Sequence, residues 1–373
     1  RDAQESRGLG DVYKRQGLDL GFLNNRLNVS FDAYIRDTKD MLMAGKTLPG
    51  VYGASSPRMN VADLRTKGWE ASITWGDSFT LASKPFNYRI MAGIGDNTSK
   101  VTKYDNPNRT LTDPYEGQQL GEIWGYVVDG YFKTDEEARN YKVDQSFVNQ
   151  MINASALDNG LHAGDLKFVD LDGNNKIEQT TSANDRKDMK VIGNSLPRYN
   201  YNFGISADWY GIDFSVLFQG IGKQNWYPGA ETSMFWGPYS RPYASFIPSD
   251  FMSQVWSEEN TDAYFPRPRG YVALGSNREL AVVNTKYLQN LAYCRLKNLS
   301  IGYTLPDKWL SKIGFEKIRV YFSGENLLTF TKLHSDYIDP EQASASNSWK
   351  TSKSDANIYP WAKTYSFGVD ITF

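Results

Sequence analysis

The sequence has almost no cysteine or histidine. Of its 373 residues one is cysteine, Cys294, and two are histidine, His162 and His334. A single cysteine excludes an intrachain disulfide framework and a cysteine-based zinc site. A Ser–His catalytic pair would need one of the two histidines, and neither lies in a recognisable nucleophile motif. Carboxylate pairs at glycosidase spacing and glycine-rich phosphate loops do not stand out either, so we do not expect an enzyme.

The chain also lacks a charge excess and long apolar runs. Its 41 basic and 43 acidic residues give a formal net charge of −2, which leaves no basic footprint for nucleic acid. Its mean hydropathy is −0.54, and no segment approaches the roughly 18 consecutive apolar residues of a membrane helix. A transmembrane barrel is not excluded, because each of its strands hides apolar residues among polar ones.

Aromatic residues and a two-residue alternation are abundant. Phe, Trp and Tyr make up 14% of the chain. In YSFGVDITF (365–373) apolar side chains occupy every second position, which is the pattern of a β-strand with unlike surroundings on its two faces. We predict an all-β fold of about ten strands, either a soluble sandwich or a transmembrane barrel. Other segments with this alternation are 27–35, 69–75, 199–209, 212–220 and 317–327.

The predicted connections are of two kinds. Short turns lie at Asn24-Asn25, at 78–84 and at Tyr210-Gly211. Long polar and aromatic stretches occupy 44–59, 102–120, 132–195, 227–285 and 332–360. Compact soluble domains rarely carry loops of that length, whereas short periplasmic turns and long extracellular loops are typical of outer-membrane barrels. We therefore favour an antiparallel transmembrane β-barrel over a sandwich.

Three tryptophans lie near the ends of predicted strands. They are Trp75, Trp209 and Trp226. Aromatic girdles mark the two membrane interfaces of such barrels, so these residues are candidates for them. For any one of them taken alone, an ordinary core tryptophan is the better interpretation.

Residues 1–16, RDAQESRGLGDVYKRQ, differ from the rest of the chain. They are charged, have no apolar period and contain no hydrophobic region of a secretion signal. They resemble translated sequencing-adapter sequence, and the alternative is a solvent-exposed loop. We predict a non-native leader at 1–16, outside the fold, and a barrel segment at 17–373.

Several long motifs follow one another in a fixed order. They are GDLKFVDLDGNNKIE (164–178) with NDRK (184–187), VWSEENTDAYFPRP (255–268), YLQNLAYCRLKNLSIGYTLP (287–306), RVYFSGENLLTFTK (319–332) and YPWAKTYSFGVDITF (359–373). Together they resemble the SusC/RagA family of TonB-dependent transporters of Bacteroidota. The resemblance spans nearly all of 17–373. The last motif also has the Gly368-x-x-Ile371-x-Phe373 spacing of the C-terminal signal by which outer-membrane barrels engage their insertion machinery.

The resemblance implies the C-terminal part, about ten strands, of a 22-stranded barrel around a plug. The plug and the segment that contacts the TonB complex would lie upstream and are absent from this sequence. It implies a protein surrounded by outer-membrane lipid that imports an oligosaccharide or a peptide under a SusD-like surface lipoprotein. Two alternatives come from other classes: a secreted β-rich glycan-binding module, and an outer-membrane enzyme barrel, which the missing Ser–His context disfavours.

DLDGNNKIE (170–178) resembles a calcium loop. Calcium takes six to eight oxygen ligands, and short loops rich in Asp and Asn supply them at alternate positions. This loop has such oxygens at positions one, three, five, seven and nine, the seventh being a backbone carbonyl. The expected ligands are Asp170, Asp172, Asn174, the carbonyl of Lys176, Glu178 and Asp185.

Two positions depart from the usual calcium loop. Asn175 stands at position six, where Gly is usual, and Asn tolerates the left-handed conformation better than most residues. Thr181 stands at position twelve, where an acid normally closes the loop. In the family pattern an Asp-Arg pair closes it, and Asp185-Arg186 matches that pair. We predict a structural Ca²⁺ ion, and the alternative is an Asx-rich turn without metal.

The segment 225–256, NWYPGAETSMFWGPYSRPYASFIPSDFMSQVW, is rich in aromatic residues. Aromatic side chains stack on sugar rings and also anchor protein interfaces. The segment therefore predicts a binding surface for cargo, and the alternative is that its aromatics pack the loop against itself over the barrel mouth. The predicted cargo-binding residues are Trp226, Tyr227, Trp236, Tyr239 and Arg241, with Phe235, Tyr243 and Arg267 as further candidates.

Overall fold

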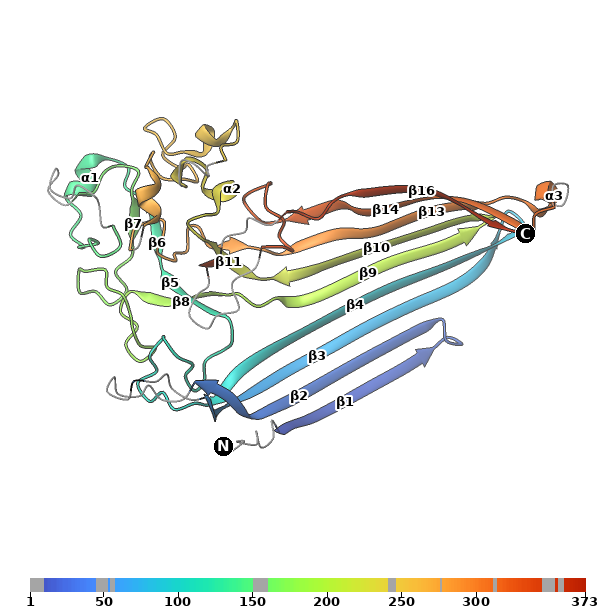
Figure 1. Cartoon of the computed structure of the whole chain (residues 1–373), viewed down its shortest axis with the longest axis horizontal. Helices are drawn as coiled ribbons and strands as arrows, with labels where there is room; N and C mark the ends of the chain where they lie inside the picture. The colour runs from blue at the N-terminus through green and yellow to red at the C-terminus, as the bar shows by residue number, and fades with distance from the viewer. Residues whose placement is uncertain are drawn as a thin grey trace.

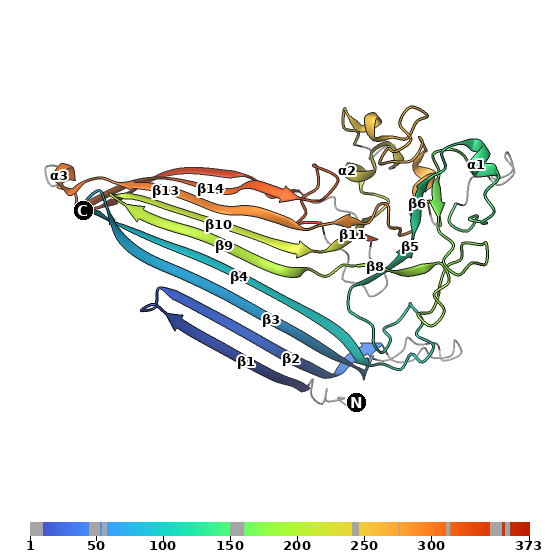
Figure 2. The ribbon, with the colours of Figure 1, turned by 180° about the vertical axis from the view of Figure 1, so that it is seen from behind.

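The protein is a long curved sheet with a compact mass of loops at one end (Figure 1). The short connections and the C-terminus lie at the other end of the sheet, and the view from behind shows the same division (Figure 2). The computed structural model describes residues 10–44, 53, 58–149, 160–240, 246–275, 277–310, 314–343, 353–354 and 359–373.

The main sheet has nine strands, and each pairs with its neighbours in antiparallel fashion. Its order is β1-β2-β3-β4-β9-β10-β13-β14-β16, so the strands follow the order of the sequence without a crossover. The strands are β1 (Gly10–Phe22), β2 (Leu27–Ala44), β3 (Arg58–Leu81), β4 (Lys84–Lys103), β9 (Arg198–Trp209), β10 (Ile212–Lys223), β13 (Tyr293–Thr304), β14 (Lys317–Thr331) and β16 (Thr364–Thr372).

The strands are long enough to cross a membrane. A transmembrane strand needs about 9–11 residues, and β16, the shortest in this sheet, has 9 residues. The longest, β3, has 24 residues, a span of roughly 80 Å at about 3.3 Å per residue. No helix in the described part of the chain is long and apolar enough to span a membrane.

One face of the sheet carries exposed apolar side chains. Phe203 on β9 and Phe218 on β10 stack on this face with ring centroids 4.8 Å apart. Val369 is 58% exposed and Phe367 is 82% exposed. An exposed apolar face of this size needs an apolar environment to cover it. The alternation predicted from the sequence is therefore present, and other exposed residues of the set are Ile73, Ile90, Ile205, Ile301 and Val320.

The other face carries polar side chains that bridge the strands. Arg319 on β14 donates to both carboxylate oxygens of Asp213 on β10, at 2.8 and 2.6 Å, across the intervening strand β13. Gly302 on β13 makes this possible, because a Cβ there would lie 2.4 Å from Oδ2 of Asp213 and 2.5 Å from Nη2 of Arg319. Arg319 also donates to Asp370 on β16 at 3.2 Å. One guanidinium thus joins three strands on the polar face.

The short turns are where the sequence placed them. β1 and β2 are joined by a longer loop, residues 23–26, in which Leu23, Asn24 and Asn25 have positive φ. β9 and β10 are joined by Tyr210 and Gly211 alone, both at positive φ. Positive φ at both central residues is the geometry of the tight hairpin turn that matches strand twist. β3 and β4 are joined in the same way, through Ala82 and Ser83.

The long loops gather into a folded unit that we call the head. It comprises residues 104–149, 160–197, 224–240, 246–275, 277–292, 332–343 and 353–354. Small sheets run through it: β5 (Glu122–Tyr126) with β8 (Met189–Asn194), β6 (Val128–Tyr131) with β7 (Leu166–Phe168), and β11 (Asn225–Pro228) with β12 (Gln289–Asn290) and β15 (Lys353–Ser354).

The helices of the structure are short. The head contains α1 (Asp135–Arg139), α2 (Ser233–Trp236) and 3₁₀ turns at Gly237–Tyr239, Phe251–Gln254 and Tyr271–Leu274. α3 (Asp307–Leu310) lies in the connection between β13 and β14, at the opposite end of the sheet (Figure 1). The protein is thus mostly β, as predicted.

The exclusion of residues 1–16 from the fold was wrong for part of that segment. Gly10–Gln16 form the first half of β1 and pair with β2. A strand needs backbone partners more than an apolar period, and Arg15 adds two 2.8 Å hydrogen bonds to Asp32. The lack of apolar alternation was therefore a poor guide at this edge of the sheet.

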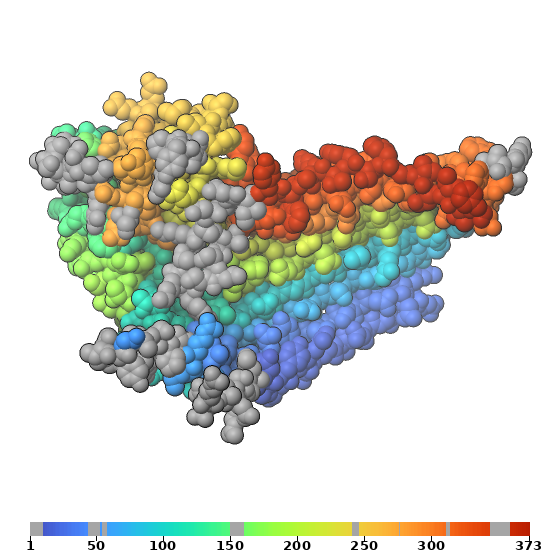
Figure 3. Space-filling view, viewed as in Figure 1, coloured from blue at the N-terminus to red at the C-terminus, as the bar shows by residue number. Residues whose placement is uncertain are grey.

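The main sheet is open, and the sequence predicted only a part of a larger barrel. Among the described residues β1 and β16 are the two edges, and they do not pair with each other. The main sheet has nine strands where about ten were expected, and the remaining strands belong to the head. The unlike faces of the sheet agree with a barrel wall. The space-filling view shows its strands lying side by side in chain order, from blue to red (Figure 3).

Candidate functional site

The aromatic residues predicted to bind cargo form the core of the head instead. Trp226, Tyr227 and Trp236 are 0% exposed, and Tyr239 is 1% exposed. Their polar atoms have internal acceptors: Tyr239 donates to the Pro266 carbonyl at 2.6 Å, and Trp236 Nε1 donates to the Gly229 carbonyl at 2.9 Å. A ring without exposed surface cannot stack on a sugar.

This outcome corrects the prediction for those four residues in favour of the packing alternative. Phe235 is buried with them, and its ring lies edge-on to Trp236 at 4.8 Å. Trp226 is therefore a core residue and does not belong to an interfacial girdle. Arg241 and Tyr243 lie outside the described residues.

The other two girdle candidates lie on the sheet, toward the short-turn end. Trp75 Nε1 donates to the hydroxyl of Tyr88 at 2.8 Å, and Trp209 Nε1 donates to the Leu81 carbonyl at 3.1 Å. Indole rings with an apolar body and a satisfied N–H are suited to a membrane interface. Their placement agrees with the predicted role.

A buried ion network ties three loops of the head together. It consists of Asp165, Arg267, Arg269 and Glu279. Arg267 Nε lies 2.6 Å from Oδ1 of Asp165, and Arg269 Nε lies 3.1 Å from Oε1 of Glu279. Arg269 also contacts Asp165, so one guanidinium joins both acids. Asp165 is 0% exposed and Glu279 is 1% exposed. Two acids and two bases balance in charge, which is the condition for burying ions.

The two acids of the network also hold backbone N–H groups of the neighbouring loop in place. Glu279 accepts the N–H of Leu166, and Asp165 accepts the N–H of His162. Burial raises the pKa of Glu279 to about 7, since Arg269 lowers it by less than burial raises it and Asp165 adds to the rise. Reading the sequence did not find this network, although Arg267 was a candidate for contacting cargo. The guanidinium of Arg267 instead pairs with Asp165.

The predicted calcium loop brings three carboxylates together. Oxygens of Asp170, Asp172 and Asp188 all lie within 4.8 Å of one another. Asp188 was missed, because it lies sixteen residues beyond Asp172 and no spacing rule connects them. It is buried and accepts the N–H groups of Leu171 and Glu178, at 2.8 and 2.7 Å. These contacts fold the far end of the segment back onto its start.

Other predicted calcium ligands lie outside this group of three carboxylates. Asp185 is not in this group, and its backbone forms hydrogen bonds with Ser182 and Thr180. Asn174 donates to Asp172 and to Glu178 at 3.2 Å, while Glu178 lies 3.4 Å from Lys187 Nζ. The structure therefore brings Asp188 to the loop in place of Asp185, because the acid that meets Asp170 and Asp172 lies three residues later than expected.

The backbone of the loop agrees with its sequence. Asn175 has a φ of 63°, the left-handed conformation expected of position six. Lys176 donates its N–H to the side chain of Asn174 at 2.8 Å. Partial desolvation opposes the charge of Asp170, but the N–H groups of Asn175, Gly173 and Asn174 outweigh it and lower the pKa of this carboxyl.

The chemistry of the three carboxylates fits a hard cation. Burial raises the pKa of Asp188, the N–H groups of Glu178 and Leu171 lower it by less, and the charges of Asp172 and Asp170 raise it further. Among the described ion pairs none involves these three acids. A cation with oxygen preference would relieve the repulsion.

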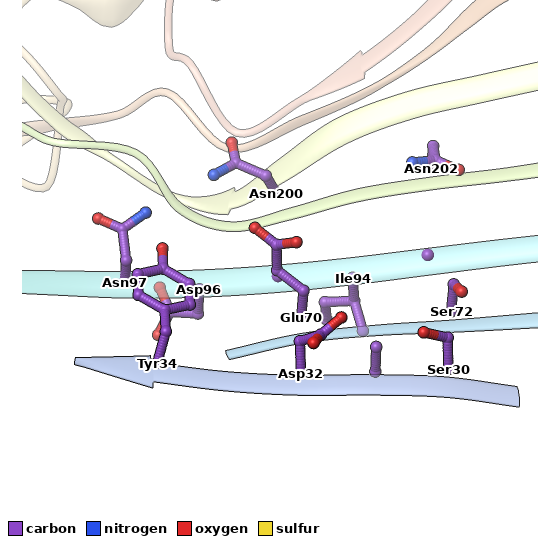
Figure 4. Close-up of a pocket in the computed structure, with 13 residues that line it drawn as sticks. Ser30, Asp32, Tyr34, Glu70, Ser72, Ile94, Asp96, Asn97, Asn200 and Asn202 are labelled. Carbon is purple, nitrogen blue, oxygen red and sulfur yellow. The ribbon is translucent and has the colours of Figure 1, made fainter. Parts of the chain in front are cut away.

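A polar pocket opens on the polar face of the sheet, and we call it the Glu70 pocket. It has a volume of about 330 Å³. Figure 4 shows side chains of β2, β3, β4 and β9 converging there, with Glu70 between Asp32 and Asn200. Its polar lining consists of Ser30, Asp32, Tyr34, Glu70, Ser72, Asp96, Asn97, Asn200 and Asn202.

Sequence reading did not select these residues as a site. The polar positions of the strands were recognised as one face, but nothing in the spacing indicated which of them would meet. A second pocket of about 350 Å³ adjoins the first, and Asp32, Tyr34, Glu70 and Asn97 line both. The hollow therefore continues along the polar face toward β1.

Head stability is expected to depend on pH through Glu279. Its pKa of about 7 in the folded protein lies above the ordinary 4.5, so the folded state holds the proton more tightly. Stability then falls as pH rises from about 4.5 to about 7. In the full-length protein, the melting temperature followed by tryptophan fluorescence should drop by on the order of 5 °C between pH 5 and 8.

Two variants test whether Glu279 is the group that causes this pH dependence. Glu279→Gln should flatten this pH dependence, whereas Glu258→Gln, at an exposed head position, should leave it as in the wild type. An unchanged pH profile in Glu279→Gln would show that Glu279 does not titrate in this range.

The chain is similar in sequence to known TonB-dependent receptors. No protein-family model matches the chain. It is 28% identical over 376 residues to the TonB-dependent receptor P3 of Formosa agariphila, covering 96% of this chain and 33% of that protein. It is 23% identical over 359 residues to the TonB-dependent receptor SusC of Bacteroides thetaiotaomicron, covering 96% of this chain and 31% of SusC.

Solved structures share the fold. The RagAB peptide importer in its open-open state matches with a TM-score of 0.69 at 21% identity, over 97% of this chain and 34% of that one. A structure of the RagAB peptide transporter matches with a TM-score of 0.66 at 20% identity, over 97% of this chain and 35% of that one. The chain thus spans about a third of the length of the relatives it matches.

Proposed function

We propose that this chain, whose resemblance to SusC/RagA-type TonB-dependent transporters the comparisons confirm, is the C-terminal barrel segment of an outer-membrane nutrient importer. The observation that carries the proposal is the nine-stranded sheet with one apolar and one polar face. Its apolar face would contact outer-membrane lipid, and its polar face would line the barrel lumen. The relatives are named as receptors and transporters, which agrees with the expectation that the chain is not an enzyme.

The direction of the segment follows from its two ends. Outer-membrane barrels have short periplasmic turns and long extracellular loops. The turns at Asn24-Asn25 and Tyr210-Gly211 lie at the end of the sheet opposite the head (Figure 1). The head would therefore face the outside of the cell, and the short turns would face the periplasm.

The remaining parts of the proposed transporter would lie outside this segment. A plug, which would close the lumen, and the region that engages the TonB complex are proposed for the part upstream of residue 17. A SusD-like surface lipoprotein is the proposed partner over the head. The cargo is an oligosaccharide or a peptide, too large for porins.

Burial of the four predicted cargo-binding aromatics weakens the alternative of a secreted glycan-binding module. That function required exposed rings, and those of Trp226, Tyr227 and Trp236 have no exposed surface. A soluble module would also have to cover the apolar face of the sheet, where Phe367 is 82% exposed. Membrane lipid provides that cover without a further protein.

Import is tested by deleting the gene of the full-length protein in its host. Growth should fail on one polymer, a particular oligosaccharide or peptide mixture, and persist on the monosaccharides or amino acids that compose it. Monomers pass through porins and serve as the matched control. Equal growth of the deletion and parent strains on every polymer tried, with uptake of labelled polymer unchanged, would contradict the proposal.

We also propose a structural Ca²⁺ ion at Asp170, Asp172 and Asp188. The support is the convergence of three carboxylates, one of them buried, in a loop whose sequence resembles a calcium loop. The ion would fix the segment 164–190 in the head, far from any reacting group. Its binding would stabilise the folded loop by an amount that grows with the ratio of free calcium to its dissociation constant.

Limited proteolysis of the full-length protein tests the metal. Chelation should increase cleavage within 164–190 by about tenfold, the effect of losing a site held at some ten times its dissociation constant. Asp188→Asn should show the same increased cleavage in the presence of calcium. Asp185→Asn is the matched control and should remain protected, because its carboxylate is outside the group. Cleavage that is equal with calcium and with chelator would show that the loop is an Asx-rich turn without metal.

A further inference from the structure

We propose that the apolar face of the sheet carries, at its head end, a binding site for the phosphate group of a membrane lipid. The site consists of Arg65 and Lys67 on β3 and Lys100 on β4, and we call it the cationic patch. The inference rests on the proposed barrel, in which this face contacts lipid and its head end lies at the outer leaflet. It adds a lipid class that the import function itself does not specify.

Strand register places the cationic patch on the apolar face. Side chains two residues apart on a strand share a face, so Arg65 and Lys67 lie on the same face as Ile73, which is 45% exposed. β3 pairs with β4 without irregularity over residues 64–81. Lys100 lies directly opposite Arg65 in this register, and residues directly opposite each other share a face. All three cations therefore continue the apolar surface.

The cationic patch lies where the hydrocarbon of a membrane would end. At the short-turn end of β3 the first charge on this face is Asp77, which Arg26 contacts at 3.3 Å. Between Asp77 and Lys67 the face carries Trp69, Ala71, Ile73 and Trp75. The strand runs ten residues from Asp77 to Lys67, roughly 33 Å at about 3.3 Å per residue. A strand tilted by about 40° then rises roughly 25 Å along the barrel axis, which is the height of the apolar band of such barrels.

Two of the three cations have no acid of their own. Arg65 donates to both carboxylate oxygens of Asp37 on β2, at 2.6 and 3.0 Å. Lys67 and Lys100 are exposed, and they form no ion pair within the described part of the chain. Three positive charges thus stand against one negative charge, and the cationic patch attracts anions.

The register also makes this excess of charge unfavourable. Arg65 lies directly opposite Lys100, and like charges directly opposite each other destabilise a sheet. Lys67 is the diagonal neighbour of Lys100, at a separation that long side chains can bridge. Asp96, the acid of β4, does not offset these charges, because Arg198 already donates to it. A bound anion would relieve the repulsion.

The surroundings of the cationic patch suit an anionic lipid better than a soluble anion. Ile35 on β2 lies directly opposite Lys67 and is 38% exposed, and Ile94 on β4 is 40% exposed. These apolar side chains would contact acyl chains, while the lysine stems run along the apolar surface and hold their ammonium groups at the head-group level. A lipid phosphate offers several charged acceptor oxygens to those ammonium groups. A zwitterionic lipid has no net charge to offset the excess.

The test uses the full-length protein purified in detergent, with Lys67→Gln and Lys100→Gln as single variants. Arg36→Gln is the matched control. Arg36 is an exposed cation of β2 opposite Thr66, at the level of the patch, but it lies on the polar face, where it lines the second pocket. Dioleoylphosphatidic acid is the probe, dioleoylglycerol is its counterpart without phosphate, and native mass spectrometry measures binding. Insertion of each variant in the outer membrane is checked first.

The wild type should bind phosphatidic acid more tightly than dioleoylglycerol. Lys67→Gln and Lys100→Gln should each weaken phosphatidic acid binding by about tenfold, as expected for losing a charge-assisted hydrogen bond. Neither variant should change the binding of dioleoylglycerol, and Arg36→Gln should bind both lipids as the wild type does. An excess of inorganic phosphate should leave phosphatidic acid bound, because phosphate alone lacks the apolar contacts.

The proposal is overturned when Lys67→Gln and Lys100→Gln insert normally and both bind phosphatidic acid as tightly as Arg36→Gln does. Displacement of phosphatidic acid by inorganic phosphate would also overturn it, since the patch would then be a site for a soluble anion. Either result would leave the barrel and its import function standing. Failure of the wild type itself to insert would count against the barrel, so the two kinds of failure are distinguishable.

Discussion

Backbone hydrogen bonding in a medium without water is the constraint on which the rest of the structure depends. A strand that crosses hydrocarbon must pair all its N–H and C=O groups with neighbouring strands. The continuous antiparallel order from β1 to β16 satisfies this for every interior strand of the main sheet. Alternation then follows from the pleat, since successive side chains point to opposite faces of the sheet, which would be lipid and lumen in the proposed barrel. The ion pair of Arg319 and Asp213 lies on the polar face.

The head is stabilised in a different way from the main sheet. Its loops leave the sheet at one end and form only short strand pairs of their own, so they build a core from large aromatics and a balanced set of buried ions. Trp236 and Tyr239 fill that core, while Arg269 joins Asp165 and Glu279. Loops packed in this way hold a fixed shape at one end of the sheet. The proposed binding of cargo and of a partner lipoprotein would require such a shape.

Local patterns predicted local features well. The alternation at 199–209 and 212–220 located β9 and β10, and Tyr210-Gly211 located the turn between them. Asn175 was predicted to tolerate the left-handed conformation, which it adopts. These features depend on near neighbours, so the sequence contains them.

Features that depend on distant contacts were missed or misread. Asp188 approaches Asp170 because the chain folds back, and no spacing rule shows this. Trp226 and Tyr227 were taken for a cargo surface, since an aromatic-rich loop looks the same whether its rings are exposed or buried. The first half of β1 was excluded because it lacks an apolar period, although pairing with β2 holds it. Glu70 and Asp32 meet through strand register, which composition does not reveal.

Membrane contact by one face of this sheet is tested most directly by spin labels along β9. Single cysteines at Asn202, Phe203, Ile205, Ser206, Ala207 and Asp208 of the full-length protein, in a background without native cysteine, would each carry a nitroxide in lipid bilayers. Collision with oxygen, which concentrates in lipid, should be high at Phe203, Ile205 and Ala207. Collision with a water-soluble nickel chelate should be high at the other three positions. Accessibility without a two-residue alternation, or with the opposite phase, would contradict a lipid-facing sheet.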